Sequence, residues 1–213
     1  MHYYFNSISK NVISDMHTHL SFLLSNENLS TRPIIIMCIG SDRSTGDSLG
    51  PIIGYKLEKY HFENVYVYGS LNSPIHAANL KQSLDFINKM HRKPYIIAID
   101  ASLGIPEHIG YITLGTGPLK PGLGVKKKLP EVGNIHITGI VNALCGTETV
   151  TLQTTRLSCI MSLADIISAV LVEFFYSRNN FNACLYTQPV PVPQYLPRRT
   201  SYTNRVPEAY LNS

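Results

Sequence analysis

Two aspartates stand where apolar, strand-like segments end, and both are placed as residues of a ligand or catalytic site would be. Asp47 lies in the loop that follows the run IIIMCIG of residues 34–40, and Asp100 closes the run YIIAI of residues 95–99. Open α/β sheets bind ligands at the carboxyl ends of their strands. Two converging carboxyl groups do not both ionise easily, so one keeps a proton to donate while the other deprotonates a water. We predict that Asp47 and Asp100 form a catalytic pair, with the two roles unassigned between them.

Each of these residues also has a simpler interpretation. From spacing alone, Asp47 is better explained as the N-cap of the following helix. Asp100 is also compatible with a turn or cap, although a carboxylate that ends a buried strand needs partners. Asp42, on the same loop, is interpreted as a loop hydrogen-bonding residue or an auxiliary ligand. His76 is expected to be a partly exposed surface histidine, and His136 a structural histidine in a strand.

Two other kinds of chemistry find little support in the sequence. The segment 40–46 has the glycine spacing of a phosphate-binding loop, but Asp47 occupies the place of the Walker lysine. A carboxylate there repels phosphate, so nucleotide binding is disfavoured. A serine nucleophile is also disfavoured, because the chain has no GxSxG elbow.

The elements that must position the aspartates alternate between strand and helix. Apolar runs predict strands over 34–39, 65–68, 95–99, 109–114 and 135–137, and apolar periodicity predicts helices over 49–60, 74–91 and 157–176. Strands that alternate with helices imply a parallel sheet with right-handed crossovers. In a 2-1-3 strand order, the first and third strands are neighbours and their carboxyl ends meet. The predicted fold class is α/β, with three layers (α/β/α) and a mainly parallel sheet.

Composition divides the chain into three parts. Residues 1–31 are polar without sustained periodicity and are expected to form an N-terminal arm, propeptide-like in character. Residues 32–178 form the α/β domain. Residues 179–213 are rich in Pro, Tyr, Arg and Asn and are expected to be a poorly ordered tail.

Charge and cysteine content restrict the class of protein. The net charge of +4 is too small to indicate a nucleic-acid or membrane partner. The four cysteines form no CxxC pair, and the amino terminus lacks the pattern of a signal peptide, which together favour a cytoplasmic protein. The apolar stretch 157–176 carries Asp165 and Glu173 and has a helical core pattern, so it is predicted to be buried in the domain.

The segments GSDRSTGDSLGP (residues 40–51) and AIDASLG (residues 98–104) resemble the YyaC-type spore proteases. This family is similar to the spore germination protease and, more remotely, to hydrogenase maturation proteases. The resemblance covers residues 34–175, including TGIVN at 138–142 and LQTTRLS at 152–158. It implies a phosphorylase/hydrolase-like α/β fold and an endopeptidase of sporulation or germination. The essential aspartates of the germination protease match Asp47 and Asp100.

The resemblance also bears on metal, substrate and processing. Hydrogenase maturation proteases use acidic residues at these two positions, with a histidine, to hold nickel; His136 is the nearest candidate by chain order. No cofactor is expected, and a divalent metal held by Asp47, Asp100 and His136 stays open. The implied partner is a protein or peptide substrate, with small acid-soluble spore proteins as candidates by analogy. Germination-protease relatives lose a leader, which would correspond to the residues before Arg32.

Two other functions remain open at this point. One is a non-catalytic sporulation factor that binds a peptide or protein on the same fold, since fold does not fix function. The other is a metal-assisted hydrolase. The oligomeric state is not indicated by the sequence.

Overall fold

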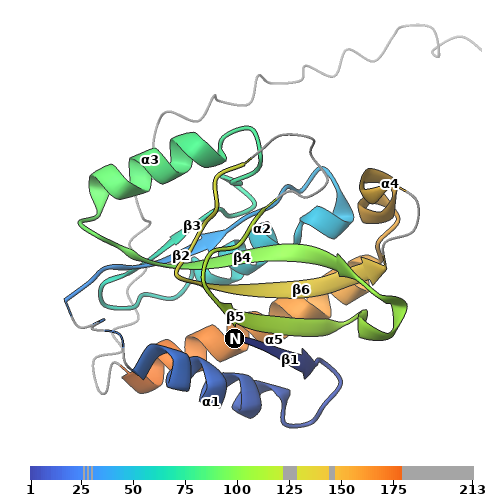
Figure 1. The fold of residues 1–213 in the computed structure, drawn as a ribbon, viewed down its shortest axis with the longest axis horizontal. Helices are drawn as coiled ribbons and strands as arrows, with labels where there is room; N and C mark the ends of the chain where they lie inside the picture. The colour runs from blue at the N-terminus through green and yellow to red at the C-terminus, as the bar shows by residue number, and fades with distance from the viewer. Residues whose placement is uncertain (26, 28, 30, 122–128, 144–146, 179–213) are drawn as a thin grey trace, which may run out of the picture.

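The computed structural model describes residues 1–25, 27, 29, 31–121, 129–143 and 147–178. Within these residues, six strands form one sheet in the order β1-β5-β6-β4-β2-β3 (Figure 1). The strands are β1 (His2–Asn6), β2 (Ile34–Cys38), β3 (Val65–Tyr68), β4 (Tyr95–Gly104), β5 (Tyr111–Thr116) and β6 (Ile135–Ala143). β2 pairs in parallel with β3 and β4, and β4 with β6, whereas β5 is antiparallel to β6 and β1. The predicted α/β class, with its mainly parallel sheet and central 2-1-3 order, is confirmed.

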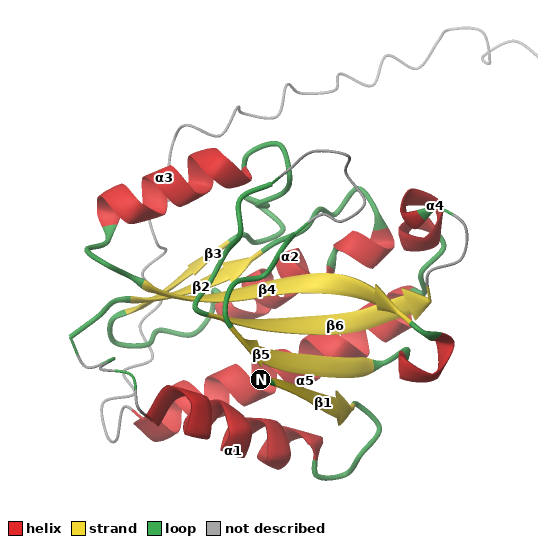
Figure 2. Cartoon of the chain, viewed as in Figure 1, coloured by secondary structure: helices red, strands yellow, loops and turns green. Residues whose placement is uncertain are grey.

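Helices cover both faces of the sheet (Figure 2). They are α1 (Val12–Ser25), α2 (Leu49–Leu57), α3 (Leu80–Met90), α4 (Glu148–Gln153) and α5 (Leu157–Arg178), with short 3-10 turns η1 (Thr45–Asp47) and η2 (Pro106–His108). α1, α2 and α5 contribute to one hydrophobic core, and α3 contributes to the other. The molecule therefore has the predicted three layers.

Successive side chains of β2 enter the two cores in turn, which explains its unbroken apolar sequence. Ile34, Ile36 and Cys38 belong to the core shared with α1, α2 and α5. Ile35 and Met37 belong to the core shared with α3. Because successive side chains of a strand point to opposite faces, a strand covered on both faces must be apolar throughout.

α5 closes the core on the side of α1 and α2. Among the described residues, it is the one helix whose length and apolar composition would allow it to cross a membrane. It packs against α1 and α2, and nine of its residues are buried, including Ile160, Ile167 and Leu171. This packing within the domain agrees with the core helix predicted over residues 157–176.

The structure differs from the arm predicted over residues 1–31. β1 pairs with β5, and α1 packs against α5 and buries Val12, Met16, Leu20 and Leu24. These four apolar residues recur every four positions, but intervening Ser, His and Thr residues obscured the period. β1 is an edge strand with a single buried side chain, Phe5, so it lacks the apolar run of a central strand. Residues 1–25 are thus part of the domain.

One further boundary differs from the sequence prediction, and one prediction falls on residues that the structure does not describe. α3 begins at Leu80 rather than at Pro74, because Ile75 forms a parallel bridge with Ile39. The Asn79 side chain holds the turn that precedes α3: its Nδ2 donates to Pro74 O at 3.0 Å, and its Oδ1 accepts from the His76 amide at 2.8 Å. The predicted tail, residues 179–213, lies outside the described residues.

Candidate functional site

The loop between β2 and α2 folds back on itself at the carboxyl end of the sheet. The Ser41 amide donates to Asp47 O at 2.9 Å, and the Gly40 amide donates to Ile75 O at 2.8 Å. Gly40 has a φ of +138°, and a Cβ placed on it would lie 2.1 Å from Asp47 O. Only glycine fits both this conformation and this approach. The loop therefore returns Asp47 to the strand end from which it departed.

Asp47 ends η1 and is not the N-cap residue of α2. The N-cap position of α2 is Ser48, whose hydroxyl donates to Thr45 O at 2.6 Å. The N-cap interpretation of Asp47 is therefore wrong. η1 lies against β4 and α4, with Gly46 packed against the backbone of Leu152. The Asp47 segment is thus positioned beside the strand that carries Asp100.

Asp100 is a buried carboxylate on β4, with 7% of its surface exposed. Its Oδ1 accepts a hydrogen bond from the Ala101 amide at 2.8 Å. The parallel register places Asp100 opposite Thr138 of β6. Ala98, two residues earlier, belongs to the core of α3, so by strand alternation Asp100 faces the same side of the sheet.

Hydroxyl groups adjoin Asp100 on this face. Thr138 Oγ1 lies 2.7 Å from Thr113 Oγ1, and Ser102 Oγ donates to Thr138 Oγ1 at 3.2 Å. On the loop of residues 40–48, Ser44 Oγ is buried without a hydrogen-bond partner among the described residues. Buried polar atoms normally have partners.

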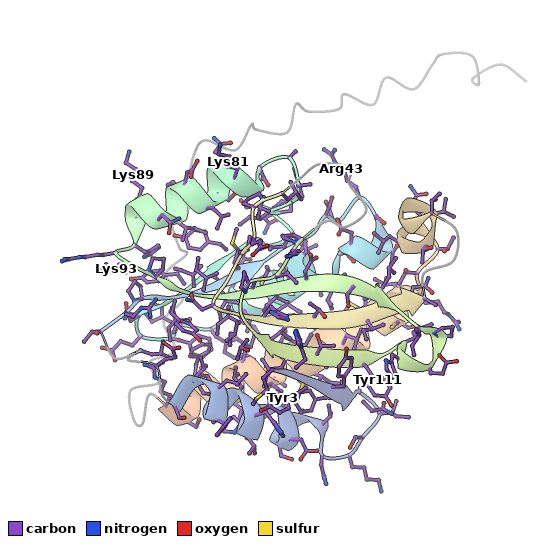
Figure 3. The ribbon with its side chains drawn as sticks, viewed as in Figure 1. Tyr3, Arg43, Lys81, Lys89, Lys93 and Tyr111 are labelled. Carbon is purple, nitrogen blue, oxygen red and sulfur yellow. The ribbon has the colours of Figure 1, made fainter. Side chains whose placement is uncertain are left out.

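Asp42 lies on the same loop, and His76 lies beside it in the segment between β3 and α3. The Gly40–Ile75 hydrogen bond brings His76 beside the loop, where burial and then Arg43 lower its pKa while Asp42 raises it. The Ala78 amide donates to His76 Nδ1 at 3.3 Å, so the neutral ring carries its proton on Nε2. Asp42 is exposed, and Arg43 projects outward from the loop (Figure 3).

The sequence predicts His76 only as a partly exposed surface histidine. Its place beside the aspartate loop depends on a bridge between residues 36 positions apart, Ile39 and Ile75, which no local pattern reveals. One feature of the sequence does point to this place. His76 follows β3, and the segment after a parallel strand opens at the carboxyl edge of the sheet.

His136 is not brought to the aspartates. It pairs with Ala98, two residues before Asp100 along the sheet, and its Nδ1 donates to Gly117 O at 3.0 Å. Among the described residues, no group of three or more His, Cys, Asp and Glu side chains is arranged to hold a metal ion. The set of Asp47, Asp100 and His136 that the resemblance suggested is therefore not assembled.

Asn142 links the end of β6 to α4, the helix that packs against η1. Its Nδ2 donates to Thr151 O at 3.1 Å and to Thr155 Oγ1 at 3.2 Å, which fixes α4 against the strand end. α4 in turn carries Leu152, the residue packed against Gly46. Asn142 thus positions the backing of the Asp47 loop without being part of the carboxylate pair.

A separate cavity of about 350 Å³ opens at the other end of the molecule. It is lined by Ser21, Leu24, Ser25, Glu27, Leu29, Phe174 and Arg178. α5 starts after α4, which lies at the aspartate edge, and its 22 residues run roughly 33 Å before they reach this cavity. The cavity is therefore distinct from the site at Asp47 and Asp100.

The family match places the chain in a family of unknown function. The chain is 49% identical over 137 residues to "Uncharacterized protein YyaC" of Bacillus subtilis (strain 168), which covers 64% of this chain and 67% of the relative. Among solved structures, the [NiFe] hydrogenase maturation protease HycI of Thermococcus kodakarensis KOD1 aligns at 15% identity with a TM-score of 0.44, covering 69% of this chain and 95% of that one. The family described as "Protein of unknown function (DUF1256)" matches residues 4–170, from β1 into α5. The chain belongs to this family.

Proposed function

We propose that the chain is a peptidase that hydrolyses peptide bonds with Asp47 and Asp100. The observation that carries the proposal is the buried Asp100 carboxyl at the end of β4, with the Asp47 loop folded back against the same strand. Taking a carboxylate out of water is unfavourable unless the surroundings compensate. A protein keeps such a group at a strand end mainly when the group has a task.

The chemistry of the pair follows from carboxyl groups held at one edge of a sheet. One group, protonated, donates a hydrogen bond to the scissile carbonyl oxygen; the other, ionised, takes a proton from the water that attacks the carbonyl carbon. The tetrahedral intermediate collapses when the protonated group supplies a proton to the leaving amine. The pair then again holds one proton, the one taken from water, and its transfer to the group that protonated the amine restores the starting state.

The substrate class comes from the resemblance to spore proteases. A protein or peptide of the sporulating cell is the proposed substrate, with small acid-soluble spore proteins as the first to test. The proposed setting is the cytoplasm of the sporulating cell or the spore. The exposed Asp42 and Arg43, with the half-buried His76 beside them, offer charged and polar groups that a peptide backbone or side chain can contact.

The test is proteolysis of a spore-protein extract by the purified full-length chain. The Asp47→Asn and Asp100→Asn variants are compared with Asp85→Asn, which removes an exposed carboxyl on α3. We expect discrete products from the native chain and from Asp85→Asn. Each site variant should cleave about 10²–10⁴-fold more slowly, the usual contribution of a general acid or base. Circular dichroism and thermal unfolding check that the variants are folded.

The remaining outcomes separate the alternative functions. Undiminished cleavage in both site variants would remove the pair from the mechanism. Stoichiometric binding of a spore peptide without cleavage would favour the non-catalytic binding protein. Loss of cleavage with a chelator, restored by a divalent ion, would favour the metal-assisted hydrolase.

A further inference from the structure

Three residues lie in one row across β1, β5 and β6, away from the aspartates. His2 pairs with Gly115, and Gly115 pairs with His136. The neighbouring Tyr3 faces α1, where its ring centroid is 4.5 Å from that of His19 (Figure 3). By strand alternation His2 therefore faces the opposite side of the sheet, the side that His136 also faces.

The glycine in the middle of the row lets the two imidazoles approach each other. A Cβ placed on Gly115 would lie 2.5 Å from His136 Nε2 and 2.6 Å from His2 Nδ1. The two nitrogens are consequently no farther apart than the sum of these distances. The ring centroids are 5.1 Å apart. Both nitrogens face a common point above Gly115.

The hydrogen bonding of His136 leaves its Nε2 available as a ligand. His136 is buried, with 7% of its surface exposed, and a carbonyl can only accept, so the Nδ1–H donates to Gly117 O. The neutral ring then carries a lone pair on Nε2, toward His2. A histidine that donates its other ring N–H to a backbone carbonyl is the usual arrangement of a metal-ligating histidine.

His2 is suited to complete the pair. It is exposed, so its side chain can rotate. The neutral imidazole is the form that binds a metal ion. Zinc–nitrogen bonds are about 2.0–2.1 Å long, so the exposed ring of His2 turns to bring its Nδ1 to the ion.

We propose that His2 and His136 form a two-imidazole site for a divalent transition-metal ion, which fastens the edge strand β1 across β5 to β6. Imidazole ligands suit zinc, nickel and copper, and water completes the coordination. The site is separate from Asp47 and Asp100 and does not depend on the proposed peptidase activity.

The test is calorimetric titration of the full-length chain with Zn²⁺ alone. Four proteins are compared: the native chain, His2→Ala, His61→Ala, which removes an exposed histidine elsewhere, and the Asp47→Asn/Asp100→Asn double variant. We expect one ion to bind the native chain, His61→Ala and the double variant with similar affinity. His2→Ala should bind at least tenfold more weakly and should lose the rise in unfolding temperature that Zn²⁺ produces in the native chain.

The opposite pattern overturns the proposal. It fails if the native chain binds no Zn²⁺, if His2→Ala binds like the native chain, or if the double variant abolishes binding, which would assign the ion to the aspartates. His2 is exposed, so its replacement leaves the fold intact. No peptide cleavage is read in this titration, so failure here leaves the peptidase proposal unaffected.

Discussion

The carboxyl of Asp100 and the ring of His76 show what single residues do at the aspartate edge. Asp100 sits on the last part of β4 that pairs regularly with β6, just before the register shift between Ser102 and Leu103. Beyond the shift β4 stays paired with β6, Leu103 with Asn142 and Gly104 with Ala143. Regular pairing up to Asp100 therefore holds the carboxyl in a fixed place at the mouth of the site.

His76 gives a pH prediction with a definite sign. Its pKa is lowered from 6.5 in the folded chain, chiefly by burial and then by Arg43. The unfolded chain therefore binds more protons than the folded chain below pH 6.5. The stability that His76 contributes is present above pH 6.5 and is lost as the pH falls toward the folded pKa.

The measurement is urea unfolding at pH 7.5 and pH 5.5. We expect the loss of stability on acidification to be smaller in His76→Gln than in the native chain. The exposed His61→Gln variant should behave like the native chain. Equal losses of unfolding free energy in all three proteins would show that folding does not lower the pKa of His76.

At the scale of elements, predictability follows from how each element is covered. β2 was predictable because it is buried on both faces, which leaves a continuous apolar run, and α5 because its buried side leaves a clear helical stripe. The start of α3 was not predictable, because the backbone of residues 74–79 is held by Ile39 and by the Asn79 side chain. The strand order predicts that Asp47 and Asp100 lie at the same edge of the sheet. It does not predict that the loop of residues 40–48 folds back on the end of β2.

The fold-back of the Asp47 loop predicts the effect of a single methyl group. Gly40→Ala places a Cβ 2.1 Å from Asp47 O at a φ of +138°. Gly117→Ala is a matched control, since its φ of +89° is also positive but nothing lies within 4 Å of the new Cβ. The control should lose about 1–2 kcal/mol of unfolding free energy from backbone strain alone.

Gly40→Ala should lose more than this control, because the loop must also move away from the strand end. In a chain that cleaves peptides, its activity should fall further than its stability, since Asp47 moves with the loop. Urea unfolding and the extract assay at a temperature well below unfolding measure the two effects. Equal stability in both variants would mean that the Gly40–Asp47 approach is not required.

For the whole molecule, the main difference from the sequence prediction is the role of its first residues. β1 completes one edge of the sheet and α1 covers part of α5, so the domain begins near residue 2 rather than at residue 32. The family match starts at residue 4, in β1. An edge strand and an amphipathic helix rich in Ser, Thr and His resemble a polar arm in sequence, because their burial depends on a partner far along the chain.

This arrangement predicts how the chain responds to changes in α1. Leu20 is 1% exposed in the core, whereas Phe22 of the same helix is 59% exposed. Leu20→Ala should lower the free energy of unfolding by about 2–5 kcal/mol, as deletion of buried methyl groups in a packed core does. Phe22→Ala, although it removes more atoms, should change it by no more than about 0.5 kcal/mol. Chemical denaturation of both variants measures the difference.

The same comparison decides whether a leader could be removed before Arg32. Such removal would strip β1 from β5 and uncover the apolar side of α5 that α1 now buries. If Leu20→Ala is as costly as expected, a chain without residues 1–31 should unfold or aggregate, and activation by loss of that segment is untenable. If Leu20→Ala unfolds like the native chain, α1 contributes little to the core, and intact-mass analysis of spore material becomes the measurement that decides on trimming.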